Sequence, residues 1–141
     1  MTASITRLDG QEAYDLLYAE YLAKLSPIEQ ETMQRTIMNS SKLWAGKADD
    51  KLLAIWGLVA PTLMSDRAYL WLFTTEHLPS HKMTFLRHSR GVVCSMLEDY
   101  STIVGHCLTS ASRSQQWLRW LGAEFDEPND KAVSFTIKAQ P

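Results

Sequence analysis

The chain changes between two hydrophobic periods, and each change predicts a new element of secondary structure. Apolar residues three and four positions apart indicate a helix with one buried face, whereas alternating or short continuous apolar runs indicate a strand. In chain order the pattern predicts a strand at 2–8, helices from 9 to about 25 and at 27–39, strands at 42–46, 52–60 and 68–75, a helix at 80–100, a strand at 102–108, a helix from 110 to 122, and strands at 123–125 and around 133–137.

Local signals place the ends of several of these elements. Ser26 is followed by proline and, three residues later, by Glu29, which is the spacing of a capping box at the start of a helix. Ser80 and Ser110 are expected to cap the long and the short later helix. Gly122 stands where a helix commonly ends in a left-handed residue. The strands before and after the polar residues 47–51 are expected to form a hairpin around that turn.

The order of the predicted elements is β-α-α-β-β-β-α-β-α-β-β, which indicates a mixed α/β layer fold. With 141 residues, of which 45% are apolar and 21% charged, we expect one domain over residues 1–141. The net charge of −2 predicts no general attraction to nucleic acid. The longest apolar run, 52–61, is too short to cross a membrane, so a cytosolic protein without membrane insertion is expected.

The two cysteines, Cys94 and Cys107, have no metal-ligand spacing around them, and no metal site is predicted. Two cysteines are too few for a disulfide scaffold, so we expect reduced thiols packed in the core.

The second half of the chain carries a family resemblance. It combines Leu-Phe-Thr-Thr at 72–75, a long helix, Ile-Val-Gly-His at 103–106, a short helix and Leu-Gly-Ala-Glu-Phe at 121–125. Together with the element order, this resembles the GNAT superfamily of acyl-CoA N-acyltransferases. The likeness extends to small GNAT-like proteins of tailed phages, some of them found near internal virion and morphogenesis genes. It implies a mixed, mostly antiparallel central sheet, splayed between its fourth and fifth strands, with helices on both faces.

Two positions depart from the pattern of active family members. Such members usually carry a Gln/Arg-x-x-Gly-x-Gly/Ala turn, whose bare N–H groups approach the pyrophosphate of CoA. The matching segment, 76–84, has no glycine, and Pro79 removes one N–H donor. The family's usual tyrosine, which protonates the leaving thiolate, is replaced by Leu118. The resemblance therefore implies a degenerate acetyl-CoA loop and the loss of acetyl transfer by the usual route.

Other groups at the expected splay are candidates for acid–base chemistry. Glu76 and His77 follow the fourth strand, and His106 lies near the end of the fifth, so each is a candidate to take a proton from an amine. The alternative is that Glu76 and His77 are exposed loop residues and that His106 is a hydrogen-bonded sheet residue. The candidate residues for binding acetyl-CoA are Phe73, Thr74, Thr75, His81, Lys82 and Arg87.

Five basic or potentially basic residues gather in the first half of the long helix. Cations there oppose the helix dipole, and a bound anion would remove the conflict. That anion is a CoA phosphate, a nucleic-acid phosphate or an acidic partner surface; the alternative is an ordinary solvated face. No DNA-binding signature is present, so nucleic acid is not an expected partner. The five residues are His81, Lys82, Arg87, His88 and Arg90.

The tryptophans are assigned in two groups. Trp56 and Trp71 lie in strand interiors and are predicted to be core residues. Trp117 and Trp120 are three positions apart on a short helix, so one of them is expected to face the core while the other points partly outward as an interface anchor beside Arg119. The alternative is that both cover the edge of the sheet.

Two classes of function follow. The favoured hypothesis is a phage-type GNAT-fold protein without orthodox catalysis that serves as a virion-assembly or host-interaction factor. It would bind a phage or host protein, with homo-oligomers possible, in the bacterial cytoplasm or the virion. Inhibition of a host enzyme is a variant of this hypothesis. The alternative is an acetyl-CoA-dependent N-acetyltransferase acting on a protein or a small-molecule amine.

Overall fold

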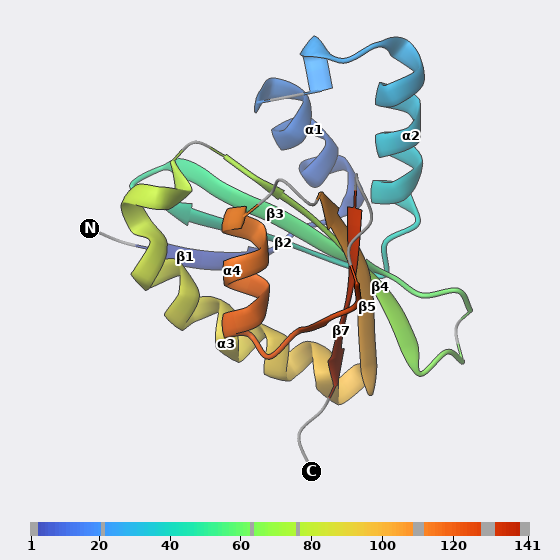
Figure 1. Ribbon diagram of the computed structural model, residues 1–141. Helices are drawn as coiled ribbons and strands as arrows, with labels where there is room; N and C mark the ends of the chain where they lie inside the picture. The colour runs from blue at the N-terminus through green and yellow to red at the C-terminus, as the bar shows by residue number, and fades with distance from the viewer. Residues whose placement is uncertain are drawn as a thin grey trace.

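The computed structural model describes residues 3–20, 22–62, 64–75, 77–108, 112–127 and 132–138 (Figure 1). The order of helices and strands is the one that the hydrophobic pattern predicts, with two short 3-10 helices added. The elements are β1 (Ala3–Arg7), α1 (Gly10–Glu20), η1 (Leu22–Lys24), α2 (Pro27–Met38), β2 (Lys42–Ala48), β3 (Lys51–Val59), β4 (Arg67–Thr74), η2 (Leu78–His81), α3 (Lys82–Asp99), β5 (Thr102–Leu108), α4 (Ser112–Trp120), β6 (Glu124–Phe125) and β7 (Ala132–Lys138).

The strands form one seven-stranded sheet in the order β1-β2-β3-β4-β5-β7-β6. Every neighbouring pair is antiparallel except β4 and β5, which run parallel and pair only from Arg67↔Thr102 to Tyr69↔Val104. Beyond that point β4 stays paired with β3, as far as Ala54↔Thr74. Likewise, β5 stays paired with β7, as far as Leu108↔Ala132. Since β4 follows β3 and β5 follows β7, the two strands diverge, and the predicted splay between the fourth and fifth strands is confirmed.

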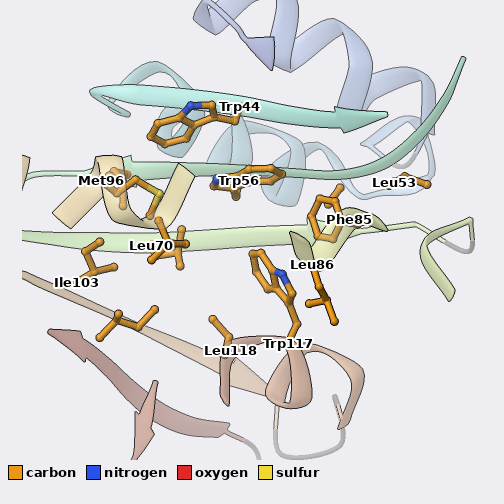
Figure 2. Close-up of a cluster of buried hydrophobic side chains, with 14 of the residues drawn as sticks. Trp44, Leu53, Trp56, Leu70, Phe85, Leu86, Met96, Ile103, Trp117 and Leu118 are labelled. Atoms are coloured by element: carbon orange, nitrogen blue, oxygen red, sulfur yellow. The ribbon is translucent and has the colours of Figure 1, made fainter. Parts of the chain in front are cut away.

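Helices cover both faces of the sheet, as predicted (Figure 1). On one face Leu17 of α1 and Ile37 of α2 belong to a buried cluster that includes Trp71. On the other face α3 and α4 contribute to a larger cluster around Trp56, in which Figure 2 shows Phe85, Leu86, Trp117 and Leu118. Trp56 is 1% exposed and Trp71 is 8% exposed, so both predicted core tryptophans are confirmed.

Two of the predicted end signals are confirmed. The Ser26 hydroxyl accepts the Glu29 N–H (3.3 Å), and the Glu29 carboxylate accepts the Ser26 N–H (3.4 Å), which completes a capping box. Gly122 has a φ of 98°, in the left-handed region. A β-carbon at this position would be strained by that φ, which explains the glycine after α4.

Two other end signals are wrong, and Ser110 lies outside the described residues. Ser80 does not cap α3, because it lies within the 3-10 helix η2, which begins at Leu78 and runs directly into the helix; α3 starts at Lys82, without a side-chain cap. The hairpin turn is also shorter than predicted. Pairing extends to Ala48↔Lys51, and Asp49 and Asp50 alone form the turn with φ values of 51° and 67°. Aspartate tolerates this left-handed conformation, so the strands extend to the turn.

Candidate functional site

The splay leaves part of the β4 backbone facing an open gap. The Thr75 N–H donates to the Leu53 carbonyl (2.9 Å), so the odd-numbered residues of β4 direct their backbone groups to β3. The even-numbered residues, Leu72 among them, therefore face β5. Since the pairing with β5 ends at Tyr69↔Val104, the Leu72 N–H and carbonyl face the gap without a partner strand.

Gly105 lies where the two strands separate. A β-carbon at this position would lie 2.7 Å from the Leu70 carbonyl oxygen and 2.5 Å from the Phe135 ring. The glycine therefore allows β5 to approach β4 closely at the vertex of the splay.

The face covered by α3 and α4 has a pocket at the mouth of the splay. Its volume is about 240 Å³, and its walls are mostly apolar. Among the described residues that line it, Lys82 is the cationic one, and its Nζ donates to Gln116 Oε1 (3.4 Å) across the pocket. The lining residues are Leu78, Pro79, Lys82, Phe85, Leu86, Gln116 and Trp117.

Of the five basic residues, four lie on α3 and are distributed around it, whereas His81 lies in η2. Lys82 reaches Gln116 near the middle of α4, whereas the Arg90 guanidinium stacks on the Trp120 ring at 4.2 Å from its centroid. Arg87 is exposed and takes no part in the mouth pocket, and His88 Nδ1 lies 2.8 Å from the Thr84 carbonyl of its own helix. Lys82 is thus the member of the group that lines the mouth pocket.

His81 occupies the junction between η2 and α3. It is half-buried, and its Nδ1 atom is covered and has no hydrogen-bond partner among the residues that the structure describes.

The other candidate binding residues at the end of β4 have structural contacts. The Thr75 hydroxyl donates to the Leu52 carbonyl (2.5 Å) and accepts the His77 N–H (3.2 Å), which fixes the turn after the strand. Thr74 pairs with Ala54 of β3. Phe73 packs against the cluster beneath α1 and α2, on the face opposite the mouth pocket. Glu76 lies outside the described residues, and His77 is half-buried in the turn.

His106 is brought together with a residue that sequence reasoning missed. It lies on β5 two residues beyond the last β4–β5 pair, and its Nδ1 is 3.3 Å from the Tyr69 hydroxyl of β4. The two ring centroids are 5.7 Å apart. Burial raises the pKa of the Tyr69 phenol above its ordinary value, so the phenol is protonated at neutral pH with a wider margin than in water. Alternation places Tyr69 on the same face of β4 as Trp71 and Phe73, but nothing in the sequence sets the register with β5.

A second hollow adjoins Tyr69 on the face that carries α2. Its volume is about 320 Å³, and its lining offers hydroxyl, amide and guanidinium groups as well as the phenol. The protein therefore has an apolar pocket between η2, α3 and α4 and, on the face that carries α2, a second hollow beside Tyr69. The residues that line this second hollow are Thr32, Arg35, Thr36, Asn39, Val59 and Tyr69.

The short helix α4 gives its two tryptophans different environments, as one of the two hypotheses predicts. Trp117 is 4% exposed and donates its Nε1–H to the Ser89 hydroxyl of α3 (3.1 Å). Trp120 is half-buried beneath Arg90, so the cation beside it comes from α3 and not from Arg119. Both tryptophans also contact the core cluster, Trp117 as a buried member and Trp120 as a partly buried neighbour. Leu118 is 1% exposed, so this position presents no group to a ligand.

Cys94 does not follow the prediction of a core-packed thiol, because its side chain is free and exposed on α3. The Cys107 side chain lies outside the described part of the structure. Within the described residues, histidine, cysteine and carboxylate side chains form no group of three suited to a metal ion. Within that same part of the chain, no helix has both the length and the hydropathy to span a bilayer.

Comparisons with known proteins support the fold. No family model matches the sequence, and no curated protein matches it. Solved structures do match. An IAA acetyltransferase from Bacillus cereus has a TM-score of 0.66 at 12% identity, covering 98% of this chain and 100% of its own. An acetyltransferase from Bacillus subtilis in complex with CoA gives 0.64 at 13%, covering 99% and 100%. The Campylobacter jejuni N-acetyltransferase PseH in complex with acetyl coenzyme A gives 0.61 at 13%, also covering 99% and 100%. The chain therefore has the GNAT fold.

Proposed function

We propose that this chain, which has the fold of the GNAT acetyltransferases, is an acetyl-CoA-dependent N-acetyltransferase that lacks the usual glycine turn. The observation that carries the proposal is the vertex of the splay. There, β4 and β5 part beyond Tyr69↔Val104, and His106 lies beside Tyr69, which lines the hollow; the mouth pocket lies between η2, α3 and α4. The acyl donor would enter from the α3/α4 side and the amine from the α2 side.

The residues at the splay fit the pantetheine arm of acetyl-CoA better than its pyrophosphate. The backbone groups of Leu72, which lie beyond the last β4–β5 pair, suit the amide-rich pantetheine arm, because they would pair with it as a strand would. At the mouth, Pro79 and the 3-10 turn replace the bare N–H groups of a glycine turn, so Lys82 is the group available for a phosphate. Bound acetyl-CoA would supply the thioester whose acetyl group passes to the amine.

The first experiment measures the thermal midpoint with and without millimolar acetyl-CoA. A ligand that binds only the folded state raises the midpoint by mass action, so we expect an upward shift. Lys82→Ala should reduce the shift, whereas Arg87→Ala, a cation of the same helix outside the pocket, should leave it unchanged. Release of CoA should then be followed with spermidine and with a short peptide that has a free N-terminus as acceptors. The absence of any midpoint shift would refute the proposal.

A second candidate function keeps the hypothesis of a phage-type, non-catalytic factor in virion assembly or host interaction. It is supported by the closed 3-10 turn at the mouth and by the burial of Leu118. In this hypothesis the half-exposed Trp120, stacked with Arg90, contributes to contact with a partner protein. A midpoint unchanged by acetyl-CoA and no CoA release would favour this candidate. The protein would then act in the host cytoplasm or within the virion.

A further inference from the structure

We propose that Tyr69 is a positioning residue that holds His106 as the Nδ1–H tautomer, so that Nε2 accepts the proton of the acceptor amine. The inference rests on the proposed acetyltransferase function and names the base of that reaction. The contact that carries it joins Tyr69 Oη and His106 Nδ1 at 3.3 Å.

The position of the pair in the fold suits this role. Tyr69 belongs to the last residue pair that β4 and β5 share, and His106 lies on the part of β5 that has left β4. Both strands are held by their outer neighbours, so the gap does not depend on the two side chains. The His106 side chain is exposed and Tyr69 is 37% exposed, which leaves the imidazole accessible to solvent beside the hollow that Tyr69 lines.

The direction of the hydrogen bond follows from what a base must do. A neutral imidazole has one N–H, whereas the imidazolium formed after proton uptake has two and accepts nothing. If the Tyr69 hydroxyl donated to Nδ1, this bond would have to reverse when the ring became charged. If Nδ1–H donates to the phenol oxygen, the same bond persists in both states and Nε2 keeps the free lone pair. A phenol is protonated at neutral pH, and burial raises the pKa of Tyr69 further, so its O–H remains a donor beside the hollow that Tyr69 lines.

The proton balance of the step is simple. The neutral amine nitrogen attacks the carbonyl carbon of the thioester, a C–N bond forms and the C–S bond breaks. One proton of the nitrogen passes to His106 Nε2, and CoA leaves as a thiolate that water protonates. A positioned base of this kind contributes about 10²–10⁴-fold to the rate.

The tautomer is tested by NMR without any ligand. In 15N-histidine-labelled protein at about pH 8.5, where an ordinary histidine is neutral, the ring nitrogen shifts report which nitrogen carries the proton. We expect His106 to be the Nδ1–H tautomer in the native protein and to shift toward Nε2–H in Tyr69→Phe. Tyr18→Phe removes a hydroxyl from another exposed tyrosine, on α1, and should change nothing at His106. An Nε2–H tautomer in the native protein, or no change in Tyr69→Phe, overturns the inference.

The kinetic test separates positioning from folding. His106→Gln should lower kcat about 100-fold or more with little effect on the KM for acetyl-CoA. Tyr69→Phe should lower kcat about tenfold in the native background and not at all in His106→Gln, because it acts through His106. His88→Gln, on the outer side of α3, is the matched control. Equal effects of Tyr69→Phe in the two backgrounds would refute positioning. If acetyl-CoA fails to bind, the proposed function fails, and the NMR result still decides the tautomer.

Discussion

Ser89→Ala offers a sharp test of how the walls of the mouth pocket are held together. Ser89 is the buried polar side chain between α3 and α4, with no exposed surface. Its hydroxyl accepts the Trp117 indole N–H (3.1 Å) and donates to the Leu86 carbonyl (3.0 Å). Because Trp117 is 4% exposed, no water replaces the lost acceptor. The variant therefore leaves a buried donor unpaired.

The expected cost follows from that unpaired donor. Leaving a buried N–H without an acceptor costs about 1–3 kcal/mol, more than the net value of an ordinary hydrogen bond. For a chain of this size, 1 kcal/mol corresponds to roughly 4 °C in the thermal midpoint. We expect a loss of about 2 kcal/mol in the free energy of unfolding, measured by urea denaturation followed by tryptophan fluorescence.

A double-mutant cycle isolates the cause. In Trp117→Phe the N–H is absent, so adding Ser89→Ala should cost about 1 kcal/mol less than it does in the native protein. Circular dichroism replaces fluorescence in this arm, because Trp117 is a reporter. If Ser89→Ala cost the same in both backgrounds, the hydrogen bond between α3 and α4 would not be the source of the loss.

Two further predictions concern the vertex of the splay. Gly105→Ala should lower the free energy of unfolding by about 1–3 kcal/mol, because the new β-carbon meets the Leu70 backbone oxygen, which cannot rotate away as a side chain can. An unchanged urea midpoint would show that β5 can move away from β4 to make room for the methyl group. The raised pKa of Tyr69 means that the folded state favours the protonated phenol. The stability that Tyr69 contributes is therefore complete below about pH 10, and it declines at higher pH because the phenol of the unfolded chain ionises first. Urea midpoints from pH 8 to 11 should fall less in Tyr69→Phe than in the native protein, and parallel curves would contradict this assignment.

Much of the fold could be predicted from local sequence because local interactions decide it. The capping box at Ser26 and the left-handed Gly122 need only neighbouring residues, and both are where the sequence places them. The predicted start of α3 at Ser80 is wrong, because serine is a good cap but the 3-10 helix η2 begins before it, at Leu78. The exposed Cys94 shows the same limit, since residue type predicts burial only on average.

The candidate site likewise has one part that the sequence predicts and another that depends on the fold. His106 was selected from its place near the end of a strand, and Lys82 from its place at the start of a helix. Tyr69 could not be paired with His106, since 37 residues separate them along the chain. Their meeting depends on the register of two parallel strands, which a long crossover helix connects and which packing on both faces fixes.

The sequence by itself determined the alternation of helices and strands, the burial of Trp56 and Trp71 and the missing glycine turn, because spacing and residue type suffice for each. Only the tertiary structure decided that β4 and β5 pair over three residues and then separate, that one cation of α3 lines the mouth pocket, and that a phenol contacts an imidazole at the vertex. The physical reason is that strand pairing and helix packing are set by the whole core, while the chemistry of the site depends on distances of a few ångströms between residues remote in the chain.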